Sequence, residues 1–324
     1  MDYRVLGRTG LGVSVLGFGC GNVGGLMIRG TPVDRERAVA RAMELGINYF
    51  DTAPSYGDGE SETNLGAVLK RLRARVYVGT KFRLDLDDLE NAATAIAQSL
   101  EASLERLGRD GVDLFQLHNH ITARRGEAGL AAADVLDRVI PALEKLREQG
   151  KTRFYGITAL GDTETLHQVI ASGRLHTAQV CYNVLNPSAG LEPTAKFSGQ
   201  DFRQLIGRAH ARGVGVLVIR VLAAGALSGT TTRHPVAVPS VDPIATGPSY
   251  AADVRRAQAL QPVVDEGHAA SLPEASLRFA ISHPDVSTVL LGYSDLKQLE
   301  DAVAAVTKGP LSEAALRRLA TLAS

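Results

Sequence analysis

The sequence has few cysteines, no excess of charge of either sign and no long apolar run. Its 35 Lys and Arg residues balance 35 Asp and Glu residues, so bulk electrostatics argues against a nucleic-acid or membrane-surface partner. The two cysteines, Cys20 and Cys181, lack metal or redox spacing, which indicates reduced thiols. The most apolar window, residues 214–227, is interrupted by Arg220 and is too short to span a bilayer. Because the sequence also begins without a signal-peptide pattern, it predicts a cytoplasmic protein.

What the sequence does have is a regular alternation of short apolar runs and amphipathic segments. With 45% hydrophobic and 22% charged residues, the composition is that of a globular protein. Eight runs with little alternation predict parallel strands covered on both faces: residues 15–18, 49–51, 76–81, 114–118, 154–158, 177–181, 214–219 and 287–291. The helices predicted between them are residues 34–45, 60–72, 89–107, 133–149, 162–171, 201–211, 273–282 and 295–306. Eight such pairs predict an α/β (β/α)8 TIM barrel, formed by residues 1–324 as a single domain.

Other segments lie outside the eight pairs. Residues 3–6 and the run after the turn at residues 8–10 predict an N-terminal hairpin that plugs the bottom of the barrel. Residues 229–251, rich in Thr, Pro, Ser and Gly, predict a long loop after the seventh strand, and such loops are usually functional or mobile. Residues 252–266 and 311–323 predict extra helices. No linker divides the chain.

Ionisable residues stand where the predicted strands end. Asp51, Lys81 and His118 end the second, third and fourth strands, and Tyr56 comes after Asp51 in the next loop. The carboxyl ends of barrel strands form one rim, where barrel enzymes have their active sites. A tyrosine has a pKa near 10, which a nearby ammonium group lowers, and a carboxylate keeps that ammonium charged. Each residue alone also fits a structural role, but together they predict a proton relay for a carbonyl–alcohol pair beside a hydride carrier.

The motifs that carry these residues, FDTAPSYG, VGTKF and LFQLHN, resemble those of the aldo-keto reductases in order and spacing. The resemblance extends from the hairpin to the last strand–helix pair. It implies that Tyr56 is the general acid or base, that Lys81 tunes it, that Asp51 supports the lysine and that His118 directs the substrate. The implied function is an NAD(P)-dependent oxidoreductase that transfers a hydride between nicotinamide and a sugar hemiacetal or a small aldehyde or ketone.

The same resemblance implies a cofactor bound in extended form across the barrel mouth, without a Rossmann domain. Residues 19–24 fit G-x-G-x-x-G, but Gly30 and Pro32 are expected to break any helix after this motif, so a tight loop near the nicotinamide is predicted instead. Gln179 matches the glutamine that holds the carboxamide. The predicted cofactor contacts are Cys20, Gly21, Asp51, Thr158, Gln179, Arg220, Leu222, Gly225, Leu227, Gly292, Ser294, Gln298 and Asp301.

Some of these positions depart from the family pattern. Ile219 replaces an aromatic residue that stacks on the nicotinamide, and Thr158 precedes an alanine where an asparagine is common. Arg220 is compatible with a phosphate contact, a substrate anion or a structural salt bridge. Asp295 adds negative charge where many NADP-using members have a cation, which favours NAD, although Lys297 weakens that argument. The prediction is NAD or NADP, with a preference for NAD.

The predicted substrate is a small carbonyl compound or a sugar. The segments IPALEKLREQGKTRFYGITAL and VLLGYSDLKQLEDAVAAVTK are similar to the sugar-oxidising branch that includes L-galactose dehydrogenase, whose members oxidise C1 of an aldose to a lactone. The predicted substrate contacts are Tyr56, His118, Asn119 and His120, and further candidates in the loops are Ile28, Arg29, Ile121, Arg220 and Arg233. The sequence predicts neither the oligomeric state nor the direction of the reaction.

Two alternatives stay open at this point. His118 and His120 share one face of a strand, as two ligands of a metal-dependent barrel hydrolase would. Such sites usually need more histidines at later strand ends, whereas strands five and six end near Thr158 and Cys181, so no metal site is predicted. A non-catalytic cofactor-binding protein on the same scaffold is the second alternative, against which the complete set of four residues argues.

Overall fold

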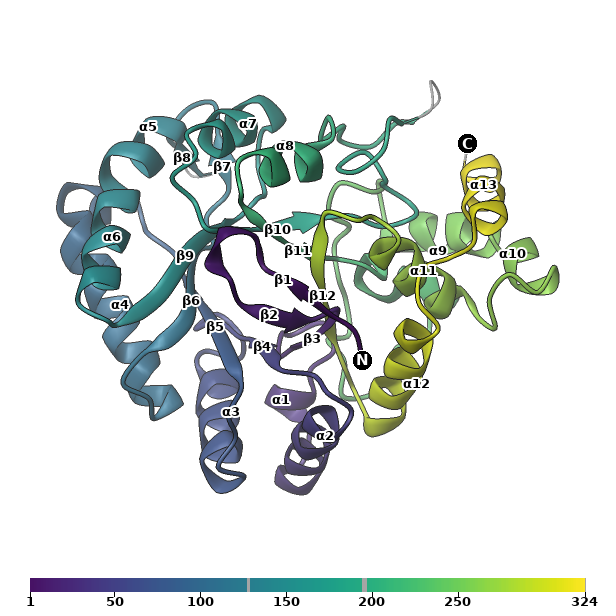
Figure 1. Ribbon diagram of the computed structural model, residues 1–324, viewed down its shortest axis with the longest axis horizontal. Helices are drawn as coiled ribbons and strands as arrows, with labels where there is room; N and C mark the ends of the chain where they lie inside the picture. Colours follow the sequence, from purple (N-terminus) through teal and green to yellow (C-terminus); the bar gives the residue numbers. More distant parts are fainter. Residues whose placement is uncertain (127–128, 194–196, 324) are drawn as a thin grey trace.

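The computed structural model describes residues 1–126, 129–193 and 197–323. Eight parallel strands form a closed barrel in the order β10-β11-β12-β3-β4-β5-β6-β9 (Figure 1). The strands are β3 (Leu16–Gly19), β4 (Tyr49–Asp51), β5 (Tyr77–Phe82), β6 (Val112–Leu117), β9 (Thr152–Thr158), β10 (Thr177–Cys181), β11 (Gly215–Ile219) and β12 (Val286–Gly292). All eight predicted strands, and the predicted barrel, are therefore confirmed.

Helices surround the barrel, as expected from the amphipathic segments. They are α2 (Pro32–Glu44), α3 (Glu60–Arg71), α4 (Ala92–Leu107), α6 (Ile140–Glu148), α7 (Thr163–Ala171), α8 (Leu205–Ala211), α11 (Leu272–Ile281) and α12 (Leu296–Thr307). In α2, the Thr31 side chain accepts a hydrogen bond from the Asp34 amide at the first turn. The chain leaves α2 through Gly46, whose φ of 90° is left-handed. Ala38, Val39 and Ala42 are its buried face against the barrel.

Several helix boundaries differ from the prediction. Residues 133–149 form α5 (Ala132–Asp134), a π-helical segment η3 (Val135–Val139) and α6, and residues 87–91 precede α4 as the 3-10 helix η2 (Asp87–Asn91). The predicted start of α8 at residue 201 is wrong, because Arg203 and Gln204 have φ of 48° and 57°, which a right-handed helix does not allow. Residues 252–266 are divided into α9 (Tyr250–Gln258) and α10 (Pro262–Asp265), and α13 (Glu313–Leu322) is confirmed.

The glycine segment after β3 contains a helix that was not expected from the sequence. The four-residue helix α1 (Leu26–Arg29) begins after Gly25, which has a left-handed φ of 80°, and ends at Gly30. Gly30 is extended there, so it ends the helix but does not prevent one turn. Short elements also lie elsewhere, with β7 (Ile121–Thr122) and β8 (Leu130–Ala131) paired in parallel, and the 3-10 helix η4 (Ala223–Ser228) after β11.

The N-terminal hairpin closes the amino-terminal end of the barrel. Strands β1 (Tyr3–Val5) and β2 (Gly12–Ser14) pair antiparallel, with the 3-10 turn η1 (Gly7–Thr9) between them. A cluster inside the barrel unites three hairpin residues with barrel residues: Leu6, Leu11, Val13, Tyr49, Leu114, Leu217 and Leu290. The approach is so close that a Cβ on Gly7 would lie 2.2 Å from the Gly215 nitrogen, so only glycine fits there. The predicted hairpin and its plugging position are confirmed.

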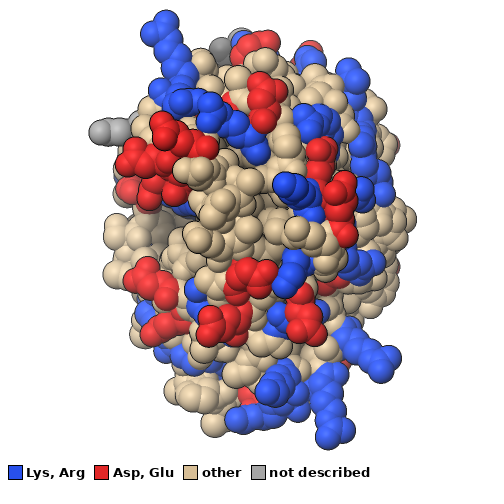
Figure 2. Space-filling model, turned by 90° about the vertical axis from the view of Figure 1, so that its left-hand side faces the viewer, with Lys and Arg blue, Asp and Glu red and all other residues tan. Residues whose placement is uncertain are grey.

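The outer surface carries both signs of charge side by side. Figure 2 shows Lys and Arg side chains interspersed with Asp and Glu side chains on the side of the molecule where Figure 1 places α4 and α6. Ion pairs elsewhere in the described structure include Lys151 with Glu101 at 3.0 Å and Arg174 with Glu144 at 3.1 Å. Within the described residues, none of the helices combines the length and apolar character that a membrane span requires.

Candidate active site

The carboxyl ends of β4 and β5 bring a carboxylate, an ammonium group and a phenol together. The Lys81 ammonium, which is fully buried, forms an ion pair with the Asp51 carboxylate. The same Nζ donates to the Thr52 carbonyl at 2.9 Å and to the Tyr56 hydroxyl at 3.1 Å. One buried cation therefore connects the carboxylate to the phenol, as the strand-end positions predicted.

The loop after β4 turns sharply so that Tyr56 reaches this cation. Gly57, Asp58 and Gly59 have left-handed φ of 64°, 51° and 91°, and they lead the chain directly into α3. Such a run is accessible mainly to glycine and to short polar residues. Gly57, the last residue of FDTAPSYG, and Gly59 after it therefore permit the turn that follows the phenol.

Asp51 receives three hydrogen-bond donors. Besides the Lys81 ammonium, the Gln179 amide donates to Asp51 Oδ2 at 2.6 Å and the Tyr49 hydroxyl donates to it at 3.2 Å. Burial raises the pKa of Asp51, although Lys81 opposes this. Burial, the largest single effect, lowers the pKa of Lys81, but the charges and hydrogen bonds of Asp51 and Tyr56 together outweigh it, so the pKa of Lys81 is raised. The lysine is therefore protonated at neutral pH.

The phenol of Tyr56 keeps its proton at neutral pH. Burial raises its pKa above the ordinary value of 10, and the Lys81 ammonium acts in the opposite direction. The ammonium lies 4.7 Å from the centroid of the tyrosine ring. The expected effect of the lysine is thus present, but the expectation that it lowers the pKa of the tyrosine below its ordinary value is wrong, because burial outweighs it.

His118 is a neutral imidazole beside the phenol. It comes directly after the last residue of β6, and its backbone amide donates to the Phe82 carbonyl at 2.8 Å. Its ring lies edge-on to the Tyr56 ring, with the centroids 6.1 Å apart. Burial, and to a smaller extent the charge of Lys81, lowers the pKa of His118 to about 2. The imidazole therefore offers a hydrogen bond to a substrate oxygen, not a positive charge.

These groups face a large cavity at the barrel mouth. Its volume is about 940 Å³. Its walls include Tyr56, in the loop after β4, and also Gln298 and Asp301 of α12. This size is at the upper end of the range for small-molecule sites. Glycines keep backbone exposed along it: a Cβ on Gly21 would lie 3.4 Å from the Tyr56 ring, and Gly225 has a φ of 105°. A cavity that extends from the phenol to the beginning of α12 fits an extended dinucleotide.

Most of the predicted cofactor residues line this cavity: Gly21, Asp51, Thr158, Gln179, Arg220, Leu222, Gly225, Gly292, Ser294, Gln298 and Asp301. Cys20 and Leu227 are not in its lining. Both are buried, 1% and 0% exposed, and the Cys20 thiol points toward the Phe18 carbonyl at 3.9 Å. They lie behind the wall that their neighbours form. Both cysteines are free thiols, as the sequence predicted.

Several of these side chains already have partners within the protein. The Ser294 hydroxyl donates to the Gly24 carbonyl at 2.7 Å and so fastens the glycine segment to the end of β12. Gln298 accepts a hydrogen bond from the Ser294 amide, and Asp295 caps α12 by accepting one from the Gln298 amide. The carboxylate that lines this part of the cavity is therefore Asp301, which Lys297 contacts at 2.6 Å.

The predicted substrate residues separate into two groups. Tyr56, His118 and His120 line the cavity. Asn119 does not, because its amide accepts from the Leu84 amide at 2.9 Å and donates to the Leu84 carbonyl at 2.8 Å. Of the wider loop candidates, Arg220 and Arg233 line the cavity, whereas Ile28, Arg29 and Ile121 lie outside its lining.

Arg83 lines the cavity as well, although it is not among the residues predicted from the sequence. It lies two residues after Lys81, so it continues the side of the strand that already carries the lysine. This two-residue spacing from Lys81 was the signal in the sequence that could have identified Arg83 as a cavity residue. The charge of Arg83 contributes to lowering the pKa of His118 and of His120.

The predicted long loop, without regular structure from residue 229 to 249, crosses toward the glycine segment. Arg29 donates to the Val236 carbonyl at 2.7 Å. Arg233 donates to the Ala224 carbonyl at 2.9 Å and to the Val23 carbonyl at 3.4 Å. Arginines from both sides thus fasten the loop over one part of the cavity wall.

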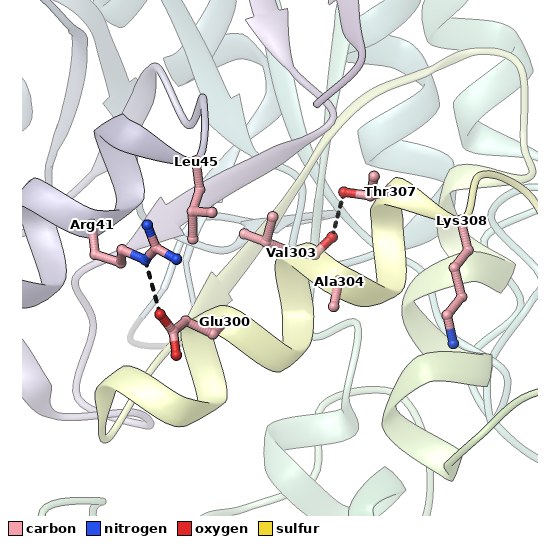
Figure 3. A pocket seen from close by; sticks show the side chains of 7 residues that line it. All are labelled: Arg41, Leu45, Glu300, Val303, Ala304, Thr307 and Lys308. Atoms are coloured by element: carbon pink, nitrogen blue, oxygen red, sulfur yellow. Dashed lines mark hydrogen bonds and ion pairs between the residues drawn. The ribbon is translucent and has the colours of Figure 1, made fainter.

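A second, smaller depression lies outside the barrel, in the seam between α2 and α12 (Figure 3). Its volume is about 390 Å³, and Figure 3 shows its lining, Arg41, Leu45, Glu300, Val303, Ala304, Thr307 and Lys308. The Arg41 guanidinium and the Glu300 carboxylate pair with each other at 2.8 Å. The polar groups at this seam serve helix packing, and the chemistry belongs to the barrel mouth.

The part of the chain that the structure describes contains no cluster of three or more His, Cys, Asp or Glu side chains suited to a metal ion. His118 and His120 therefore gain no further ligand there, and the hydrolase alternative has no support from the geometry.

Comparison with known proteins gives the same answer as the geometry. A profile of the Aldo/keto reductase family matches residues 15–323. The chain is 31% identical over 319 residues to an L-galactose dehydrogenase of Arabidopsis thaliana, which covers 95% of this chain and 89% of that protein. It is 34% identical over 212 residues to a D-threo-aldose 1-dehydrogenase of a Pseudomonas species, covering 57% of this chain and 62% of that protein.

The fold has a close counterpart among solved structures. An aldo-keto reductase from Bacillus halodurans, in its holo form, matches with a TM-score of 0.75 and 26% identity, covering 100% of this chain and 97% of that chain. The family profile, the relative that covers 95% of this chain and the solved structure all agree on the family and on the barrel fold. The chain therefore belongs to the aldo/keto reductase family and is an NAD(P)-dependent oxidoreductase of that type.

Proposed function

We propose that this enzyme transfers a hydride between NAD and a carbonyl–alcohol pair, with Tyr56 as the general acid or base. The substrate class is the C1 hemiacetal of an aldose, oxidised to a lactone, or a small aldehyde or ketone. The observation that carries the proposal is the Lys81 ammonium bonded both to the Asp51 carboxylate and to the Tyr56 hydroxyl, 3.1 Å away. Two of the relatives are named as sugar dehydrogenases, which supports the aldose.

The residues of the barrel mouth divide the chemistry among them. A bound nicotinamide supplies or accepts the hydride. Tyr56, protonated at neutral pH, donates its proton to the carbonyl oxygen during reduction. During oxidation its phenolate form takes the proton of the substrate hydroxyl. The Lys81 ammonium stabilises the phenolate that each direction requires at some stage. Neutral His118 donates a hydrogen bond to the same substrate oxygen and fixes its position. These roles favour an enzyme over a non-catalytic cofactor-binding protein.

The cofactor is proposed to lie along the cavity from Tyr56 to α12. Thr158 and Gln179 would meet the carboxamide, while backbone from Leu222 to Gly225 would meet the pyrophosphate. Asp301, in the middle of α12, lines the cavity, and a carboxylate near the ribose favours a 2′-hydroxyl over a 2′-phosphate. We therefore propose NAD as the preferred cofactor. We further propose that residues 1–324 act as one domain in the cytoplasm, where Cys20 and Cys181 stay reduced.

The test is a panel of aldoses, aldehydes and ketones, each followed by the absorbance of reduced nicotinamide with NAD and with NADP. We expect turnover of at least one aldose to its lactone and a higher kcat/KM with NAD. Turnover with a strong preference for NADP would refute the cofactor assignment alone. Cofactor binding without turnover of any member of the panel would contradict the proposed activity.

A further inference from the structure

Arg220 has an unusual backbone conformation at the barrel mouth. It comes directly after Ile219, the last residue of β11, and has a left-handed φ of 58°. Its carbonyl accepts hydrogen bonds from the Asn183 side-chain amide at 2.9 Å and from the Ala223 backbone amide at 2.8 Å. Residues other than glycine rarely adopt this conformation, and such outliers concentrate at functional sites. These hydrogen bonds hold the backbone of Arg220 in the left-handed conformation, and that conformation fixes the direction in which its side chain leaves the end of β11.

The guanidinium of Arg220 has no carboxylate partner in the described part of the chain. Its hydrogen bond is to the Asp242 backbone carbonyl at 3.3 Å, and the Asp242 carboxylate contributes only a small electrostatic effect. Burial lowers the pKa of Arg220. Arg106, also partly buried, is paired with Glu62 at 2.6 Å, whereas Arg4 donates to three backbone carbonyls at 2.7–3.1 Å; among the described residues Arg220 has neither a carboxylate nor such a set of short bonds. Removing a cation from water without an opposite charge is unfavourable, so a bound anion would stabilise Arg220.

The cation lies near the proton-transfer group. Arg220 and Tyr56 line the same cavity. Burial lowers the pKa of Arg220 overall, and Cys181 and Tyr56 act in the opposite direction, so both lie within electrostatic reach of its charge. Arg83 stands across the mouth from it, because β5 and β11 are on opposite sides of the eight-stranded barrel. Both arginines line the same cavity. A molecule bound at Tyr56 would therefore lie between two positive charges.

A cofactor phosphate is the other anion that Arg220 could meet. However, Arg233 already lies between the Ala224 carbonyl of η4 and the Val23 carbonyl of the glycine segment. Ala224 belongs to the backbone from Leu222 to Gly225 that is proposed to meet the pyrophosphate. Arg233 thus supplies a cation to that region, which leaves Arg220 for a charge on the substrate.

We propose that the substrate of this enzyme carries an anionic group, a carboxylate or a phosphate, and that Arg220 binds it. This inference rests on the proposed function, since it assumes that the substrate carbonyl or hemiacetal is at Tyr56. The half-buried Arg220 makes the direct charge-assisted hydrogen bonds. The exposed Arg83 adds longer-range attraction, which salt screens.

The first experiment measures kcat/KM for matched pairs that differ only in the charged group. The pairs are galacturonate and galactose, succinic semialdehyde and butanal, and glyceraldehyde 3-phosphate and glyceraldehyde. We expect the anionic member to be preferred by roughly 10- to 100-fold, and the pair that shows it distinguishes carboxylate from phosphate. In Arg220→Gln the ratio falls toward one, and Arg220→Lys restores part of it. In Arg83→Gln the fall is smaller and disappears at high salt. Arg317→Gln, at an exposed side chain of α13, leaves every ratio unchanged.

A second experiment does not depend on turnover. Calorimetry with the cofactor-saturated enzyme compares butyrate with the uncharged butyramide. We expect butyrate to bind at least roughly tenfold more tightly, and Arg220→Gln to abolish the difference. Affinity for the cofactor alone is measured for the same variant. Weaker cofactor binding with the substrate ratios intact would assign Arg220 to the cofactor and overturn the inference.

The two experiments separate the two proposals. Turnover of neutral substrates without any preference for anions would refute the anion subsite but would be consistent with the proposed function. Selective binding of butyrate through Arg220, without turnover of any carbonyl compound, would refute the proposed function but would support the anion subsite.

Discussion

The two ends of the same barrel have opposite chemistry. At the amino-terminal end, Leu6, Leu11 and Val13 of the hairpin fill the bore with apolar volume. At the carboxyl end, Asp51 and Lys81 are buried as charged groups beside an open cavity. The eight strands are common to both ends, so the difference arises from the residues at each end of the strands, such as Asp51 in β4 and Lys81 in β5, and from the segments that adjoin them. Packing at one end stabilises the barrel and leaves the other end free to hold groups that packing alone would not tolerate.

Tyr49 connects the two ends. Its ring belongs to the apolar cluster of the bore, while its hydroxyl donates to Asp51 at 3.2 Å. There is room for the ring because Gly17 and Gly79 carry no side chain, and a Cβ on Gly79 would lie 2.1 Å from the tyrosine hydroxyl. The division between a structural end and a chemical end can therefore be tested by substitutions at each end and at Tyr49.

The largest effect is expected at the chemical end. Tyr56→Phe removes the hydroxyl that carries the proton, so kcat should fall by roughly 10²- to 10⁴-fold. Cofactor affinity should be retained, because the ring that faces Gly21 remains. The control is Tyr3→Phe on the hairpin, where 54% of the residue is exposed and turnover should be unchanged. Steady-state kinetics and cofactor titration measure both, and near-normal turnover of Tyr56→Phe would refute the role of the phenol.

Breaking the buried ion pair should affect both stability and turnover. Asp51→Asn leaves the fully buried Lys81 ammonium without its counterion, which should lower the free energy of unfolding by about 3–5 kcal/mol. The double variant Asp51→Asn with Lys81→Met removes both charges and should recover much of that stability but not the activity. Denaturant unfolding and kcat measured on both variants decide this. If the double variant is no more stable than the single one, the pairing argument is wrong.

At the structural end, stability should change without chemistry. Leu6 is fully buried in the plug, so Leu6→Ala should lower the free energy of unfolding by about 2–5 kcal/mol through lost apolar contact and a cavity. Turnover per folded molecule should stay at the wild-type value. Denaturant unfolding and active-site titration measure the two quantities. A large loss of kcat in this variant would show that the two ends are coupled.

The smallest effect is expected at Tyr49, the residue that connects the two ends of the barrel. Tyr49→Phe keeps the ring in the plug and removes one of three donors to Asp51, so stability should fall by no more than about 1.5–3 kcal/mol. Turnover should fall less than in Asp51→Asn, since Lys81 and Gln179 still hold the carboxylate. Tyr77→Phe, at a residue that packs against the same cluster, is the matched control. Equal effects of the two substitutions would mean that the hydroxyl of Tyr49 has no special part.

The structural end and the barrel were predictable because they depend on patterns that survive in the sequence. Buried strands appear as apolar runs, and strand ends of a parallel barrel must meet at one rim, which is why Asp51 and Lys81 could be paired. Side-chain directions within a run carry no such signal. Nothing in the sequence shows that the Tyr49 hydroxyl and the Gln179 amide both donate a hydrogen bond to Asp51.

Unusual local backbone conformations were a second reason why some predictions from the sequence were wrong. The left-handed conformations of Arg203 and Gln204 delay α8, and no glycine signals them. The direction of the pKa of Tyr56 depends on how deeply the phenol is buried, which sequence proximity to a lysine does not reveal. Arg83 was missed for a different reason, since an exposed arginine after a strand is ordinarily a solvated charge.

The most direct measurement of the central claim is the pH dependence of kcat for oxidation in wild type and in Lys81→Met. Oxidation needs the phenolate of Tyr56, whose pKa is raised by burial and lowered by the Lys81 ammonium. The rate should therefore rise with pH in the wild type, and loss of the ammonium should move that rise to higher pH. An unchanged profile in Lys81→Met, or one moved to lower pH, would contradict the claim that the lysine stabilises the phenolate.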